Sequence, residues 1–147
     1  MKILGIDPGV KTGAASLKDG KITSVSTIPP HKIAVLLGLM QPDLVVYEDS
    51  RLISHSFTTA TNRAAALKIA RNVGEIDAWC KLIEFACKEL GIVAHGISPK
   101  NKGAKLNSDH FKRLTGFTEL TNQHERDAAM CAWPYRLSGH PFLICWN

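Results

Sequence analysis

Residues 2–7 read KILGID and are followed at once by Pro8 and Gly9. The apolar run has the length of a buried β-strand, and a Pro-Gly pair is typical of a turn. Asp7 therefore stands at the carboxyl end of a strand whose other residues we expect to be buried. Because a carboxylate at the rim of a buried strand has a desolvation cost, the pattern favours a functional use for Asp7.

Two further strands are predicted downstream of this turn, over residues 12–17 and 21–28. Between them lie Lys18, Asp19 and Gly20, and an Asp-Gly pair between two strand-like segments is a strong signal for a β-hairpin. The chain is therefore expected to open with three consecutive antiparallel strands.

Helical and strand patterns alternate through the rest of the chain. Apolar side chains at helical spacing and valine-rich runs predict helix, strand, helix, strand, helix and helix. In chain order these elements cover residues 31–40, 43–48, 62–90, 92–97, 108–114 and 122–133. This order favours an α/β fold with a mixed five-stranded sheet, three antiparallel strands and then two parallel ones, flanked by helices. The polar stretch over residues 49–61 is expected to be a mobile loop.

The composition is that of an ordinary globular protein. The 147 residues predict a single domain over 1–147, and 45% hydrophobic residues exclude a disordered chain. No apolar run approaches the roughly 20 residues of a membrane span, and the N-terminus does not resemble a signal peptide, so we expect a cytoplasmic location. The four cysteines form no CxxC pair and are expected to be buried free thiols. The net charge of +5 is compatible with a polyanionic partner.

A second carboxylate, Glu48, ends the predicted strand over residues 43–48. A third, Asp127, lies three residues after His124 on the final helix, so both project from one helix face. If that helix packs beside the first and fourth strands, these side chains and Asp7 converge beyond the strand ends, where open α/β sheets bind ligands. Such a cluster would repel itself unless divalent cations neutralise it, and carboxylate oxygens suit Mg²⁺ or Mn²⁺.

Two such ions about 4 Å apart can activate a water and stabilise the leaving oxygen of a phosphodiester. Each carboxylate taken alone has a plainer interpretation, as a turn residue at Asp7, an exposed strand end at Glu48 or a surface helix residue at Asp127. All three, however, adjoin segments that we expect to be buried. Three such coincidences favour a metal-dependent site.

Four segments carry a resemblance to a known family. They read GIDPGVKTG at 5–13, VVYED at 45–49, ARNVGEIDA at 70–78 and HERDAAMCAW at 124–133. In this order they resemble the RuvC-type Holliday junction resolvases of the ribonuclease-H-like superfamily. The resemblance implies a ribonuclease-H-like fold and a homodimer that binds four-way DNA junctions and nicks two strands symmetrically. It also implies a bacterial or phage-type protein that associates with the nucleoid when bound to DNA.

The resemblance further implies metal-dependent hydrolysis that leaves 5′-phosphate and 3′-hydroxyl ends, with two Mg²⁺ or Mn²⁺ ions in each active site. Asp7, Glu48 and Asp127 match the catalytic and metal-binding carboxylates of the family. His124 falls where family members carry aspartate or histidine, and it would supply a nitrogen ligand or help to stabilise the leaving group. We expect all four residues to be catalytic.

The segment after Glu48 departs from the family pattern. It reads DSRLISHSF, whereas better-known members carry an aromatic residue here that helps to open the junction. Arg51 and Phe57, the nearest aromatic, are therefore our candidates for DNA contact in this segment. Asp49 and Glu125 are expected to face away from the site, since adjacent strand residues and neighbouring helix residues point in different directions.

Lys100, Lys102 and Lys105 cluster in a basic loop just after the predicted fifth strand. The family places lysines near this point, close to the scissile phosphate, although lysine clusters are more often solvated surface. Beside an acidic metal site they would hold the phosphate backbone without reading sequence. Five other basic residues could widen this surface: Arg63, Lys68, Arg71, Lys112 and Arg113.

The helix over residues 62–90 carries apolar residues on two faces, including Leu67 and Phe85 outside its main stripe. Two apolar faces are more than one sheet can cover, although core packing is the commoner use of such a face. We therefore expect a homodimer paired through this helix, with two active sites on one side of the dimer. Gly74 within it costs about 1 kcal/mol relative to alanine, which close approach of a neighbouring backbone would explain.

Three other functions stay open at this point. A ribonuclease-H-like nuclease could act on other branched DNA or on structured RNA with the same chemistry. The segment DPGVKTG also resembles the phosphate loop of actin-like kinases and ATPases, but those proteins need two such domains. A binding module without nuclease activity is disfavoured because all three acidic positions are filled.

Overall fold

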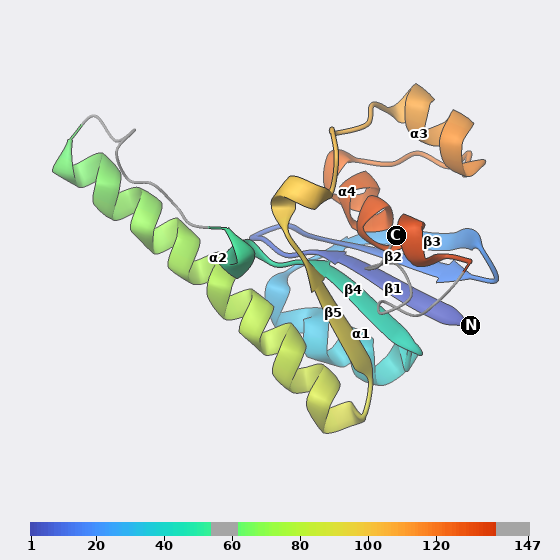
Figure 1. Ribbon diagram of the computed structural model, residues 1–147, viewed down its shortest axis with the longest axis horizontal. Coiled ribbons are helices and arrows are strands. Elements are labelled where there is room, and N and C mark those ends of the chain that lie inside the picture. Colours follow the sequence, from blue (N-terminus) through green and yellow to red (C-terminus); the bar gives the residue numbers. More distant parts are fainter. Residues whose placement is uncertain (54–61, 138–147) are drawn as a thin grey trace.

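One five-stranded sheet, in the order β3-β2-β1-β4-β5, organises the computed structural model, which describes residues 1–53 and 62–137 (Figure 1). The strands are β1 Lys2–Asp7, β2 Thr12–Lys18, β3 Lys21–Ile28, β4 Leu44–Glu48 and β5 Val93–Ile97. The first three strands pair antiparallel, whereas β4 runs parallel to β1 and β5 runs parallel to β4. The predicted mixed sheet is therefore confirmed.

Helices cover both faces of this sheet. Within the described residues, four are α-helices, α1 Ile33–Met40, α2 Arg63–Leu90, α3 Ser108–Thr115 and α4 Gln123–Ala132. The same segments contain short 3-10 turns, η1 Pro30–Lys32, η2 Ser50–Leu52, η4 Pro99–Asn101 and η5 Trp133–Tyr135. The turn η2 occupies part of the stretch that we expected to be a loop. None of the helices in the described segments is long and apolar enough to cross a membrane.

Side chains of β1 alternate between the two faces, as the period of a strand requires. Ile3 packs into a core with residues of α3 and α4, whereas Leu4 and Ile6 pack with residues of α1 and α2. Both cores are apolar, which explains why the strand reads as a continuous hydrophobic run. Asp7 ends that run and is the last residue of the strand.

Helix α2 divides into two parts. Its C-terminal part packs on the sheet through Cys80, Ile83 and Cys87, all of them fully buried. Its N-terminal part extends beyond the sheet (Figure 1), and Leu67 and Ile69 are exposed there. The described cysteines are free and buried as expected: Cys80, Cys87 and Cys131. Burial raises the pKa of Cys87 to about 11, so this thiol is protonated at neutral pH.

Candidate active site

Asp7 and Glu48 lie side by side because their strands are parallel neighbours. Ile6 on β1 pairs with Tyr47 on β4, and the next residue of each strand is the carboxylate. The carboxyl ends of parallel strands meet at one edge of a sheet. Side chains of Asp7 and Glu48 are 15% and 23% exposed.

Helix α4 brings Asp127 to the same edge, where its side chain is only 7% exposed. The helix packs directly on β1 and β2 because two strand positions are glycine. A Cβ at Gly5 would collide with the carbonyl of Ala128, and one at Gly13 would collide with the carbonyl of His124. Glycine inside a strand often marks such a close approach of another backbone. Neither glycine was identified as a positioning residue in the sequence.

The ammonium group of Lys102 lies among the three carboxylates. Its Nζ is 3.4 Å from Asp7 Oδ1 and 3.7 Å from Asp127 Oδ2, and it contacts Glu48 Oε2 directly. The Lys102 side chain is 10% exposed. The basic loop predicted from the sequence therefore places one of its lysines inside the acidic cluster.

Charges in the cluster shift one another's protonation. Burial raises the pKa of Asp7, and the carboxylates of Glu48 and Asp127 raise it further, whereas Lys102 acts to lower it. Burial by itself would lower the pKa of Lys102, but its acidic neighbours outweigh this effect and raise that pKa. Lys102 is therefore a charged ammonium at neutral pH.

His124 and Gln123 complete the cluster from the first turn of α4. His124 Nδ1 lies 3.6 Å from Asp7 Oδ2, and its side chain is nearly half exposed. Gln123 Nε2 donates a hydrogen bond of 2.8 Å to Asp127 Oδ1, so it orients that carboxylate. Gln123 was missed in the sequence, although its position four residues before Asp127 places both on one helix face.

The N-terminus of α4 is fixed by its own polar residues. The Asn122 side chain accepts from the backbone N–H of Glu125, and the Glu125 side chain accepts from the backbone N–H of Asn122. This reciprocal capping box satisfies two N–H groups that lack helical partners. Arg126 donates to the carbonyls of Leu106 and Thr121, which ties the helix to the preceding loop. Glu125, which we expected to face away from the site, therefore caps the helix.

A second network of hydrogen bonds and ion pairs fixes the carboxyl end of β4, at Glu48 and Asp49. The Cys80 thiol on α2 donates to the Glu48 carbonyl at 3.6 Å. Arg51 donates to both carboxylate oxygens of Asp49 at 2.8 Å and to Glu84 on α2 at 3.0 Å. Burial tends to raise the pKa of Asp49, but the bonds from Arg51 outweigh it and lower that pKa. Asp49 therefore serves this network as the ion-pair partner of Arg51.

The residues expected to contact DNA lie in different environments. Lys100 and Lys105 are exposed, in contrast to Lys102. Arg51 forms ion pairs with Asp49 and Glu84. Phe57 lies outside the described residues. Arg63, Lys68 and Arg71 lie on the extended part of α2, while Arg113 is exposed on α3 and Lys112 is half-buried.

The donor chemistry of the cluster fits a divalent cation. Three carboxylates from three elements already face one positive charge, the Lys102 ammonium, and His124 stands beside them. Oxygen-rich sets of this kind suit Mg²⁺ and Mn²⁺. Within residues 1–53 and 62–137, no three acidic, histidine or cysteine side chains are spaced to hold a metal as they stand. The cation position among the carboxylates is occupied by Lys102.

Comparison with solved structures identifies the fold. The RuvC protein of Thermus thermophilus in complex with a Holliday junction substrate is similar, with a TM-score of 0.63 at 16% identity, covering 95% of this chain and 94% of that one. Another RuvC structure from Thermus thermophilus has a TM-score of 0.62 at 13% identity, covering 95% of each chain. No family model and no curated protein matches the sequence. The chain therefore has the ribonuclease-H-like fold of these RuvC structures.

Proposed function

We propose that this chain is a structure-selective endodeoxyribonuclease that resolves four-way DNA junctions by symmetric, metal-dependent hydrolysis. The observation that carries the proposal is the convergence of Asp7, Glu48 and Asp127, from two strands and a helix, around one cation. The same fold is found in a protein whose structure holds a Holliday junction substrate. The expected products carry 5′-phosphate and 3′-hydroxyl ends.

In this proposal Asp7, Glu48, His124 and Asp127 hold two Mg²⁺ or Mn²⁺ ions. When bound, such ions supply an activated water and stabilise the leaving oxygen of a phosphodiester. The chain itself positions these ligands, because Gln123 orients Asp127 and main-chain contacts fix α4 against β1. The four ligands are all catalytic residues in this mechanism.

Exposed lysines on the loop that carries Lys102 would hold the DNA backbone. Lys100 and Lys105 lie on the loop that also carries Lys102, and both are exposed. Phosphate contacts of this kind position a duplex without reading its sequence. Replacing both lysines should weaken junction binding and reduce its salt dependence.

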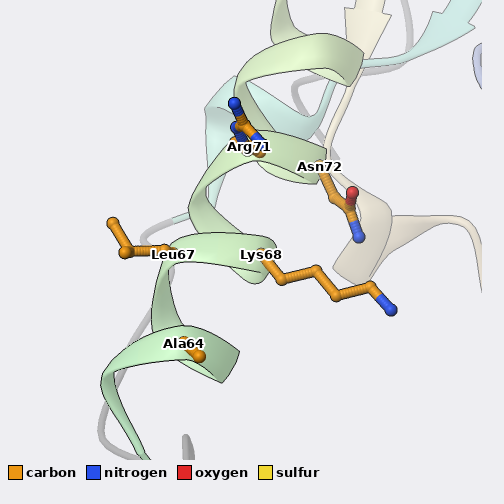
Figure 2. Close-up of a pocket in the computed structure, with 5 residues that line it drawn as sticks. All are labelled: Ala64, Leu67, Lys68, Arg71 and Asn72. Atoms are coloured by element: carbon orange, nitrogen blue, oxygen red, sulfur yellow. The ribbon is translucent and has the colours of Figure 1, made fainter.

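A homodimer through α2 would supply two active sites for symmetric nicking. The extended part of the helix exposes Leu67 and Ile69 next to basic residues. A pocket of about 750 Å³ lies here, and its described lining residues all come from α2: Ala64, Leu67, Lys68, Arg71 and Asn72. Figure 2 shows Leu67 and Lys68 pointing to opposite sides of the helix. Leu67 on one side of the helix suits contact with a second copy, and Lys68 on the other side suits contact with DNA.

The activity is tested with end-labelled substrates and either Mg²⁺ or Mn²⁺. The panel holds a four-way junction, a splayed fork, a flap, a linear duplex and an RNA/DNA hybrid. We expect paired, symmetric nicks in the junction alone, with rates lowered roughly a thousand-fold in Asp127→Asn, about 4 kcal/mol in activation free energy. Asp109→Asn, at an exposed position of α3, is the matched control and should cut normally.

Other outcomes separate the alternatives. Equal cutting of forks or of the hybrid would retain the nuclease and reject junction selectivity. An absence of cutting with both metals would reject the nuclease itself.

Dimerisation is measured by sedimentation. Leu67→Glu should yield monomers, whereas the control Leu39→Glu, which replaces an exposed leucine on α1, should not.

A further inference from the structure

Lys102 is held at the position where a metal ion would be expected. The carboxylate oxygens that surround its Nζ are Asp7 Oδ1, Glu48 Oε2 and Asp127 Oδ2. Three carboxylates whose oxygens surround a single nitrogen repel one another. One ammonium reduces this repulsion in the metal-free protein but leaves the cluster with an excess of negative charge.

A divalent ion and this ammonium cannot occupy the site together. An ion at the position of Nζ would need the three oxygens that the ammonium now faces, and two cations within a few ångströms repel strongly in a largely buried site. From this exclusion we infer that Lys102 is a built-in counter-cation, which holds the carboxylates in place in the metal-free protein and must be displaced before metal binds. The inference deepens the proposed function, since it rests on the proposed metal site and states what controls its loading.

The structure provides a path for the displaced side chain. Lys102 directly follows the short turn η4 as its C-cap residue and precedes Gly103, whose φ of +81° lies in the left-handed region that glycine adopts most readily. Its side chain also borders a pocket of about 410 Å³ whose lining includes Ser98, Asn101 and Met130. Lys102 can therefore leave the carboxylates by rotating its side chain, with no movement of the sheet or of α4.

The displaced ammonium would remain next to the site as a partner for a DNA phosphate. Its loop neighbours Lys100 and Lys105 are already exposed, so the departure of Lys102 would add a third cation to that surface. Metal loading would thereby strengthen the phosphate-binding surface. Lys102 differs in this from Lys100 and Lys105, which form no ion pair with a carboxylate in the part of the chain that the structure describes.

The experiment measures Mn²⁺ binding by calorimetry, and melting of the metal-free protein, without any DNA. Lys102→Met should bind Mn²⁺ roughly tenfold more tightly than wild type, because no ammonium competes. Its metal-free form should melt several degrees lower, because the carboxylates lose their counter-cation. Lys102→Arg, which keeps the charge, and Lys100→Met, on the same loop, should both bind Mn²⁺ within about threefold of wild type.

Equal or weaker Mn²⁺ binding by Lys102→Met would overturn the inference, as would an undetectable Mn²⁺ heat in both proteins. If Lys102→Met is unfolded without metal, its folding is titrated with MnCl₂. Recovery at millimolar Mn²⁺ supports the inference, and failure to recover overturns it. Junction cleavage with unchanged Mn²⁺ affinity in Lys102→Met would reject the inference alone. Tighter Mn²⁺ binding without any cleavage would reject only the proposed function.

Discussion

Helices α4 and α2 cover opposite faces of the same sheet, but they contact it in different ways. Helix α4 rests on the main chains of β1 and β2, at Gly5 and Gly13, and every residue from Asp127 to Ala129 is buried. Helix α2 packs on the sheet only through its C-terminal part and extends beyond it at its N-terminal part (Figure 1).

In the proposed function this difference separates two tasks. The carboxylates require fixed spacing, and α4 provides it by close packing and a capped first turn. A binding surface requires exposed side chains, and the extended part of α2 provides those. The same sheet therefore supports a rigid site on one side and an accessible helix on the other.

The largest expected loss of stability follows from a change at Gly5, on the α4 side of the sheet. Gly5→Ala places a methyl group against the Ala128 carbonyl and 3.0 Å from the Ala132 Cβ, so α4 must move away from β1. We expect the free energy of unfolding to fall by about 3 kcal/mol, as for overpacked cores. Urea denaturation followed by circular dichroism measures it. A loss below about 0.5 kcal/mol would show that α4 is not held by main-chain contact.

A smaller loss of stability is expected from a change at Arg51, which links the end of β4 to α2. Arg51→Met leaves the buried Asp49 carboxylate without its guanidinium partner and removes the bond to Glu84. Because the Arg51 side chain is 26% exposed, we expect a loss of about 2 kcal/mol in unfolding free energy, less than for a fully buried pair. Arg113→Met, at an exposed position, is the control. Unchanged stability with weaker junction binding would instead favour the DNA contact predicted for Arg51.

A gain in stability, not a loss, is expected from a change on the extended part of α2. Among the described residues, nothing lies within 4 Å of a Cβ built at Gly74. Gly74→Ala should therefore raise the stability of a single chain by about 1 kcal/mol, because alanine favours the helix. Gly38→Ala in α1 is equally open and serves as a comparison. If a second copy approaches closely at Gly74, sedimentation will show weaker dimers in the same variant.

The smallest expected effect on stability comes from the contact between His95 on β5 and Tyr135 in η5. His95 Nε2 lies 3.1 Å from the Tyr135 hydroxyl, and burial lowers the pKa of His95 below its ordinary value. The unfolded chain therefore binds more protons below about pH 6.5, so this residue should make stability fall as the pH drops through that range. Urea midpoints at pH 5.5 and 7.5 should differ less in His95→Phe than in wild type.

Much of the sheet could be predicted because its signals are local. Apolar runs that end in Asp7 and Glu48 identify both the strands and their carboxyl ends, and the Asp19-Gly20 pair identifies the hairpin. The predicted approach of Asp127 to these ends depended on packing of the last helix, which no local pattern specifies. The glycines that permit this packing, Gly5 and Gly13, carry a recognisable signal, since each interrupts a strand.

The position of Lys102 could not be predicted. Three lysines share one polar loop, and their spacing does not reveal which one turns toward the carboxylates. That choice depends on the backbone conformation of the η4 turn and Gly103 and on how this loop packs against the strand ends. Arg51 shows the same limit, because its partner Glu84 lies 33 residues away in sequence. Burial of charged pairs depends on contacts that sequence periodicity does not encode.

The main-chain contact between α4 and the strands also bears on sequence divergence. Core side chains can be exchanged for others of similar volume, and each exchange shifts neighbouring elements slightly. Here the closest approach of α4 to β1 is between a glycine and a carbonyl, so it does not depend on the volume of a core side chain at that point. A site spaced in this way tolerates extensive replacement of the residues around it. Such tolerance accords with a shared fold at 16% identity.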